Sequence, residues 1–370
     1  MQIEIYNMIP VGANISISLE AVCDSFSSLL WDIEYYKCGA FKVYIAASPR
    51  NIEIFQTGRI VGRDDDREHF GLIESVELET DAEDGDYLII KGRFLMCLLE
   101  RRIIYPTFNF TKFVSYSQIV MNVVQYNACT TGIRKLPGLV VGCSSGTCWN
   151  AETKLQVSYD NLMEWVYTIC EKIGGTANIR LSKTDNEQYE MIFELLQGTD
   201  RSILQEVNPH IIFSDRYNNL LSFTYFMDTS VKKNYAYVLG KGEGEKRKRT
   251  TYFEGTEPSS LDRYEMYVDA KDILDEEQEN GKTKPLSEEE YSELLKEKGK
   301  QNLVPTKTKS ESQIAVQSTQ FQYGVDYFVG DFVTAEHHRF GIRQNKIQLV
   351  GMIESFDRNG RNLTPTFKEV

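Results

Sequence analysis

The chain has 370 residues, 41% of them hydrophobic, and carries 54 acidic against 41 basic side chains, a net charge of −13. This acidic balance argues against a nucleic-acid-binding surface, which needs clustered Lys and Arg, and no run approaches the roughly 18 apolar residues of a membrane span. The length predicts two or three domains, and the composition is that of a folded protein.

The amino terminus and the cysteines indicate the compartment. Met1 to Pro10 has neither a cationic start nor an apolar run, and the seven cysteines are scattered and odd in number. These features predict no secretion signal, no membrane anchor and reduced thiols. We therefore expect the protein to be made in the cytoplasm of a producing cell.

Residues 1–112 predict a first β domain of about six short antiparallel strands, enough for a small barrel or sandwich. Apolar residues alternate along 25–35 and again along 41–45, with a turn at Lys37 to Gly39. A second hairpin is predicted from 52–55 and 59–61, turned by Thr57-Gly58. The opening strand is predicted at Ile3 to Ile5.

The stretch Gly71 to Ile104 combines a hairpin with a short helix. Val76 and Leu78 share one face of an extended segment, a polar loop with Asp84-Gly85 turns the chain, and residues 87–90 return. After Gly92 the period becomes helical, and the apolar positions that follow it are Phe94, Leu95, Leu98 and Leu99. Arg101 and Arg102 come at the end of this helix, where cations suit its dipole.

Residues 113–205 predict a small α+β domain. Ser115 with Gln118 forms a capping box, followed by an apolar stripe that includes Ile119 and Val123. A second helix begins near Asp160 and stops at Gly174-Gly175. Short strands are predicted at 139–141 and 155–157.

Residues 206–370 predict a second β-barrel domain with strands at 211–213, 220–226 and 235–239. An insertion at about 272–318 interrupts it, since residues 272–300 hold ten acids and five lysines, a local charge of −5. Ser287 with Glu290 predicts a helix over 288–298, followed by a flexible return strand or linker. Gly330-Asp331 inside an apolar block predicts a bulge or bend, so a β-branched residue at Gly330 is expected to cost about 1 to 3 kcal/mol.

Several of these residues form a signature. Gly92-Arg93, then Leu98-Leu99, then Arg101-Arg102 closely resembles the conserved run of a family of siphophage tail proteins. A second diagnostic block is Asp326, Tyr327, Gly330 and Asp331. Further similar positions along the chain are Trp31, Tyr35, Tyr36, Gly39, Phe41, Asp200, Arg201, Phe213, Ser214, Asn219 and Leu220. Phe94 departs from the pattern, because many relatives carry an acidic residue there.

The resemblance implies a structural virion protein that is mainly β, with two tail-tube-like β-barrel domains and a small α+β domain between them. It implies a baseplate hub at the tail tip, a homotrimer forming a ring, and no cofactor. The expected partners are the distal tail or tail tube protein on one side and a spike, fibre or tape-measure protein on the other. DNA would pass the channel without specific binding during ejection.

Two other functions are considered. Gly142 to Gly146 matches the G-x-S-x-G elbow, with Ser144 as nucleophile and His210 as a base, but that elbow needs a helix directly after it, and 147–151 has the pattern of a loop. A serine hydrolase using Ser144 and a monomeric host-surface or glycan-binding adhesin are the alternatives. We expect no catalytic residue.

The remaining motifs have simpler interpretations. Cys143 and Cys148 lack the second pair of ligands that zinc needs, and His337-His338 has no companion motif, so no metal site is expected. The glycines between Gly240 and Gly244 lack the P-loop lysine and indicate a hairpin turn. The basic run Lys246 to Arg249 is expected to guard an edge strand or to form an intersubunit salt bridge.

Overall fold

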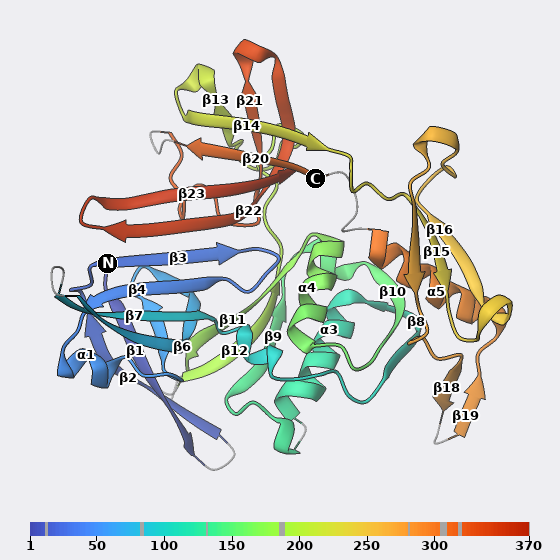
Figure 1. The fold of residues 1–370 in the computed structure, drawn as a ribbon, viewed down its shortest axis with the longest axis horizontal. Helices are drawn as coiled ribbons and strands as arrows, with labels where there is room; N and C mark the ends of the chain where they lie inside the picture. The colour runs from blue at the N-terminus through green and yellow to red at the C-terminus, as the bar shows by residue number, and fades with distance from the viewer. Residues whose placement is uncertain are drawn as a thin grey trace.

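The computed structural model describes residues 1–11, 14–81, 85–130, 132–184, 189–279, 282–303, 309–316 and 320–369, and its fold is mainly β (Figure 1). The helices are α1 Pro49–Ile54, α2 Cys97–Glu100, α3 Tyr116–Val124, α4 Leu162–Ile173 and α5 Glu288–Leu303. The strands are β1 Ile3–Val11, β2 Asn14–Cys23, β3 Ser28–Glu34, β4 Ala40–Ala46, β5 Ile60–Arg63, β6 Asp66–Asp81, β7 Gly85–Phe94, β8 Phe108–Ser115, β9 Leu139–Ser144, β10 Glu152–Val157, β11 Thr176–Lys183, β12 Tyr189–Leu196, β13 Ile212–Ser214, β14 Leu220–Asp228, β15 Tyr235–Leu239, β16 Arg249–Phe253, β17 Glu265–Asp269, β18 Glu276–Glu279, β19 Lys282–Pro285, β20 Lys309–Val316, β21 Phe332–His337, β22 Ile342–Asp357 and β23 Gly360–Glu369.

One large sheet contains strands from both ends of the chain. Its order is β14-β20-β23-β22-β3-β4-β7-β6-β5-β1-β2, and β21 and β13 are attached beside β22. The two halves join where β3 pairs antiparallel with β22, so that Trp31 lies opposite Glu354. Figure 1 shows this seam, with blue β3 beside red β22.

The large sheet has two end strands, β14 and β2. The order of its described strands therefore does not close on itself, and the two predicted barrels remain a prediction. The ribbon of β1 and β2 projects from the body at the lower left of Figure 1. An uncovered end strand presents unpaired N–H and C=O groups that can pair with another chain.

The first strands follow the sequence pattern, with one error. The hairpins β3–β4 and β6–β7 are confirmed, whereas the predicted turn residue Asp84 lies outside the described residues. The prediction of a strand at 52–55 is wrong, because these residues follow or lie in helix α1. Ser48 accepts a hydrogen bond from the Asn51 amide, and Pro49 occupies the first helical turn, so this helix has the usual start signals.

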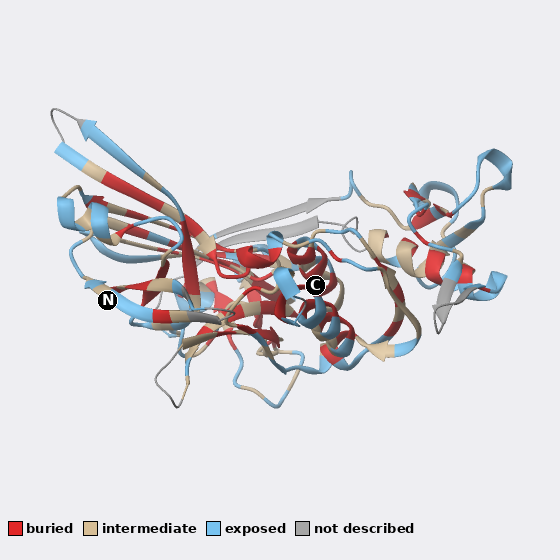
Figure 2. Cartoon of the chain, turned by 90° about the horizontal axis from the view of Figure 1, so that it is seen from below, coloured by how far each residue is buried: buried red, intermediate tan, exposed pale blue. Residues whose placement is uncertain are grey.

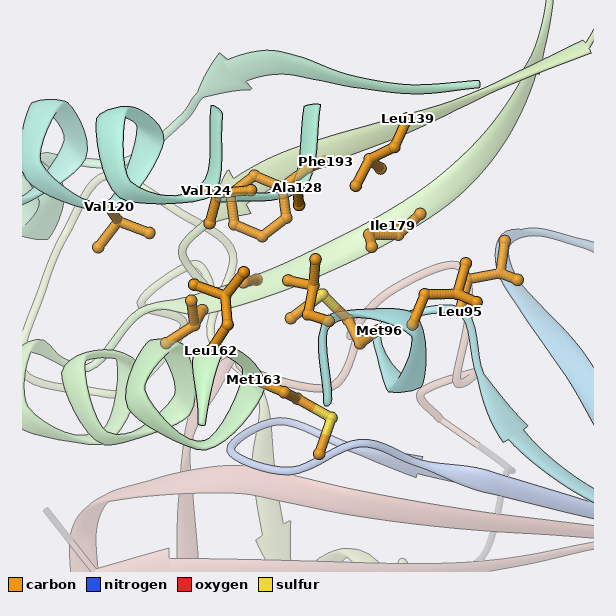
Figure 3. Close-up of a cluster of buried hydrophobic side chains, with 14 of the residues drawn as sticks. Leu95, Met96, Val120, Val124, Ala128, Leu139, Leu162, Met163, Ile179 and Phe193 are labelled. Atoms are coloured by element: carbon orange, nitrogen blue, oxygen red, sulfur yellow. The ribbon is translucent and has the colours of Figure 1, made fainter. Parts of the chain in front are cut away.

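The α+β part is built as the sequence indicates. Ser115 caps α3 by accepting the Gln118 amide, Asn161 caps α4, and Gly174 ends α4 in the left-handed region. Leu98 and Leu99 of α2 pack in the same core. Figure 3 shows α3, α4 and the strand residues Ile179 and Phe193 meeting in that core.

Residues 235–303 form a small separate unit. The sheet β16-β15-β17 packs against α5 around its own apolar core, and Figure 2 shows these buried residues apart from those of the main body. The predicted helix is confirmed as α5. β15 thus lies outside the large sheet, whereas β20, from the stretch predicted as a return strand or linker, pairs with β14 and β23 inside it. The other linker residues 304–308 and 317–319 lie outside the described residues.

None of the helices in the described part of the chain combines the length and the apolar content that crossing a bilayer requires.

Candidate functional site

Tyr35, which directly follows β3, is the centre of a junction between three parts of the chain. Its hydroxyl accepts a hydrogen bond from the Gly198 amide at 3.0 Å and donates to the Gly174 carbonyl at 3.3 Å. Burial raises the pKa of Tyr35 well above its ordinary value, so the hydroxyl stays protonated and can donate. The ring therefore holds the first sheet against the α+β part.

Gly330 joins the carboxy-terminal strands to the same ring. Its φ is +101°, a region that side-chain-bearing residues rarely adopt, and a Cβ added there would lie 2.2 Å from Cε2 of Tyr35. Its carbonyl accepts the side-chain amide of Gln348 at 3.0 Å, and Gln348 in turn accepts the hydroxyl of Tyr36 at 2.6 Å. The predicted bend at Gly330 is confirmed, although it comes just before β21 rather than inside a strand.

Asp331 completes the junction. Its buried carboxylate accepts the backbone amide of Thr199 at 2.7 Å, the Arg201 Nε at 2.9 Å and the backbone amide of Phe328 at 3.1 Å. Asp200, beside these partners, pairs with Lys346 at 2.6 Å. Burial acts to raise the pKa of Asp200, but the interactions with Lys346 and the hydrogen bonds from Ser202 together outweigh it and lower that pKa. Three separated stretches of the signature, Tyr35-Tyr36, Asp200-Arg201 and Gly330-Asp331, thus meet in space.

Asp326 and Tyr327, the first half of the second signature block, lie in the segment that precedes Gly330 and Asp331. The Asp326 carboxylate accepts the Gln322 amide at 2.7 Å, which closes a tight turn. Tyr327 is buried and packs edge-on against Phe213 with ring centroids 5.6 Å apart. Burial raises the pKa of Tyr327 to about 12, as expected of a core phenol.

The Gly92-Arg93 run has a separate structural role. A Cβ at Gly92 would lie 1.9 Å from the Leu72 carbonyl oxygen, so the crossing of β7 and β6 needs glycine there. Arg93 donates to Glu74 at 2.8 Å and to Glu100 at 2.6 Å, which ties the hairpin to helix α2. The run therefore fixes how the first sheet meets the α+β part.

The arginines after α2 differ from one another. Arg102 donates through Nε to the Arg134 carbonyl at 2.6 Å, and the Arg134 guanidinium returns to the carbonyls of Ile103 and Tyr105. Arg101 is exposed and caps the end of the helix. Within the described residues, Arg102 is thus tied by hydrogen bonds to the segment around Arg134.

A buried arginine at the end of β5, which sequence reasoning missed, reaches the seam between β3 and β22. Arg63 is 1% exposed, binds Asp65 through two nitrogens at 2.8 and 2.9 Å, and reaches Glu354 at 3.3 Å. Its guanidinium also lies 5.4 Å from the Trp31 ring. No spacing in the sequence links residue 63 to residue 354. The one sequence signal for Arg63 is that a charged residue closely follows an apolar stretch that is predicted as a strand.

Three stretches of the signature, Tyr35-Tyr36, Asp200-Arg201 and Gly330-Asp331, thus form a buried, hydrogen-bonded joint. At its centre the hydroxyl and carboxylate of Tyr35 and Asp331 are engaged by backbone or side-chain partners. Such an arrangement holds the parts of the chain in a fixed relation.

Comparison with known proteins agrees with the signature. The family model described as Siphovirus ReqiPepy6 Gp37-like protein matches residues 3–367. The chain belongs to this Gp37-like family. The predicted siphophage family is therefore confirmed, and no curated protein sequence matches the chain.

Solved structures give this Gp37-like chain the fold of phage tail proteins. It is similar to a tail protein from Neisseria meningitidis MC58, with 14% identity, a TM-score of 0.57 and coverage of 99% of this chain and 96% of the other. A 43 kDa tail protein of prophage MuSo2 from Shewanella oneidensis has 11% identity, a TM-score of 0.55 and coverage of 99% and 98%. The prophage tail protein gp18 from Listeria monocytogenes EGD-e has 11% identity, a TM-score of 0.54 and coverage of 100% and 95%.

The Gp37-like chain does not give Ser144 the setting of a nucleophile elbow. Ser144 ends β9, which runs parallel to β12, and the chain continues through a 3-10 turn at Thr147–Asn150 into β10 instead of a helix. His210 places its Nε2 2.7 Å from the Gln205 carbonyl in its own loop. The geometry thus lacks the helix that orients such a serine.

The other motifs fall in structural positions. Within the described ranges no cluster of His, Cys, Asp and Glu could hold a metal, and Cys143 lies 3.8 Å from a Glu194 oxygen. The glycines after β15 form the predicted turn of the hairpin to β16, an end strand of its sheet. His337 lies 3.4 Å from Asp215 instead of being fully solvated.

Proposed function

We propose that this protein is a structural component of the virion, a baseplate hub at the distal end of a phage tail or of a phage-derived tail-like particle. Three copies form a ring, and each supplies two tube-like domains that become barrels only in the assembly. The ring closes or extends the tail-tube channel and connects the distal tail or tube protein to the spike, fibre or tape-measure protein.

The observation that carries the proposal is the single open sheet that joins both ends of the chain. Twisted open sheets rarely exceed about ten strands without closing or splitting, and exposed end strands invite pairing. The path from β14 to β2 is longer than that and ends in strands that each have one neighbour in the described chain. We propose that β2 of one copy pairs with β14 of the next, so that three sheets become one ring.

The exposed side chains of β2 fit such a contact. Leu19 is 49% exposed and Val22 is 44% exposed on this strand. Burying apolar side chains of this size stabilises an interface by about 25 cal/mol for each Å² removed from water. The buried seam at Arg63 and the joint at Tyr35 would keep the two halves of each sheet aligned under load.

The assembly test compares two variants by mass measurement in solution. The double variant Leu19→Lys, Val22→Lys should shift the protein from trimer to monomer, because two charges would be buried at the contact. Leu261→Lys is the matched control, since Leu261 is 92% exposed in the separate unit and should leave the trimer intact. A wild-type protein that stays monomeric at all concentrations would reject the ring.

The location test is antibody-gold labelling of tail-like particles by electron microscopy. Gold at one tail tip is the expected result, and gold along the tube or only on free protein would overturn the hub assignment. The net charge of −13 predicts an acidic channel wall that repels passing DNA. A trimer structure whose channel is lined mainly by Lys and Arg would contradict that part of the proposal.

A further inference from the structure

A cleft of about 720 Å³ lies where the α+β part faces the separate unit of residues 235–303. Tyr116, Lys172 and Ile173 come from the α+β part, and Tyr252 and Lys300 come from the other side. Cavities of about 300 to 1,000 Å³ are the size that proteins use for ligands. We call this feature the lysine cleft.

The lysine cleft concentrates positive charge in an acidic protein. Its lining holds four lysines, at 172, 232, 233 and 300, and one glutamate at 254; when Glu297, the ion-pair partner of Lys172, is included, the local charge is +2, whereas the chain has −13. A concave site of one sign focuses the field and raises the local concentration of oppositely charged groups. An anionic ligand therefore suits the cleft.

Two of these lysines are available to a ligand. Lys172 is paired with Glu297, and the Lys232 ammonium lies 5.2 Å from the Tyr264 ring. Lys233 and Lys300 form no ion pair within the described part of the chain. The repulsion among the lysine ammonium groups would decrease when the carboxylates of a ligand enter the cleft.

Besides the charged groups and the polar Asn234 and Thr256, the lining contains apolar side chains. Ile173, Leu303, Pro258 and the Tyr252 ring line the cleft together with the charged groups. An inorganic anion or a strongly hydrated polymer would leave these groups unused. A segment that carries carboxylates beside apolar side chains would satisfy both parts of the cleft.

We propose that the lysine cleft binds an acidic peptide segment of another tail component, with carboxylates at Lys233 and Lys300 and an apolar side chain against Ile173 and Leu303. A nucleic-acid duplex is a poor candidate, because it is convex and the chain around the cleft is acidic. The inference deepens the hub proposal by naming the chemistry of one partner, and in that respect rests on it. Since the two walls belong to different units, the bound segment would also hold those units together.

Fluorescence anisotropy tests the proposal with a fluorescein-labelled nonapeptide that alternates glutamate with leucine. The wild type should bind it, and the double variant Lys233→Gln, Lys300→Gln should weaken binding at least about tenfold, since two charge-assisted contacts are lost. The matched control Lys37→Gln, Lys91→Gln removes the same charge from the β3–β4 turn and from β7, away from the cleft, and should bind as the wild type does. Added salt should weaken the wild-type complex.

Three further probes assign the chemistry. Replacing glutamate by glutamine, or leucine by serine, in the peptide should abolish or strongly reduce binding, and undiminished binding of either peptide would overturn the proposal. Polygalacturonate tests the rival ligand: lysine-dependent binding of this anionic glycan without binding of the peptide would replace the peptide by a glycan. Equal binding to the lysine variants and the wild type would also reject the cleft.

The same samples separate this inference from the hub proposal. The solution mass of each variant is measured beside its anisotropy. Trimers that do not bind the peptide overturn the lysine cleft alone, and monomers that bind it with lysine dependence overturn the ring alone.

Discussion

Replacing Gly330 by alanine or valine tests the joint around Tyr35. The φ of +101° imposes strain of about 1 to 3 kcal/mol on a residue with a side chain. The new Cβ would also lie 2.2 Å from the Tyr35 ring, so the ring must move and its two hydrogen bonds, to Gly198 and Gly174, are lost or weakened. At about 0.5 to 1.5 kcal/mol for each bond, the total is about 2 to 6 kcal/mol.

The fold provides a matched control for this substitution. Gly360 has a φ of +113°, but an added Cβ would meet no atom within 4 Å. Gly360→Ala should therefore cost only the strain, about 1 to 3 kcal/mol, and Gly330→Ala should cost about 1 to 3 kcal/mol more. Valine at 330 should be worse than alanine because it also places two methyl groups near the ring.

The assay is the midpoint of thermal or urea unfolding, followed by circular dichroism for each variant. Tyr35→Phe supplies a second measurement, because it removes the hydroxyl but leaves the ring, and it should lose the hydrogen-bond part of the cost alone. Equal midpoints for Gly330→Ala and Gly360→Ala would refute the reasoning that Tyr35 blocks a side chain at 330.

Three other predictions follow from the buried charges and the separate unit. Arg63→Leu should lower the free energy of urea unfolding by about 3 kcal/mol, because the buried carboxylate of Glu354 then keeps only one arginine partner, Arg361. Adding Glu354→Gln to this variant should recover part of the loss. No recovery would contradict the pairing of Arg63 with Glu354. Burial opposes the charged form of His69, but the interaction with Asp66 outweighs burial and raises the pKa of His69. The pair should therefore stabilise the fold fully below about pH 6.5 and lose this effect as the pH rises through the folded-state pKa of His69. Thermal midpoints from pH 6 to 8 should fall, and His69→Gln should reduce that fall; an unchanged fall in the variant would reject a role for His69. Replacing residues 229–308 by an Asn-Gly turn should leave a soluble folded body, because β14 and β20 already place the flanking residues opposite each other; insoluble protein would show that the unit is needed for folding.

Local sequence patterns were enough to predict many helices and hairpins of this protein. The apolar period and the capping residues Ser115 and Gly174 define α3 and α4, because helix ends must satisfy their own backbone groups within a few residues. The hairpin that ends at Gly92 and the acidic helix α5 follow from the same kind of signal. The strand predicted at 52–55 failed because Ser48 and Pro49 start a helix, a signal that competes with apolar alternation.

The sequence also identified the signature residues, through their resemblance to a tail family, but not what they touch. Only tertiary structure brought Tyr35, Gly198 and Gly330 to one point, paired β3 with β22, and left β14 and β2 as ends of one sheet. The lysine cleft has the same origin, since its lysines come from segments that lie far apart in the chain. The physical reason is that helices and turns depend on neighbours a few residues away, whereas strand pairing and buried joints depend on which distant surfaces fit together.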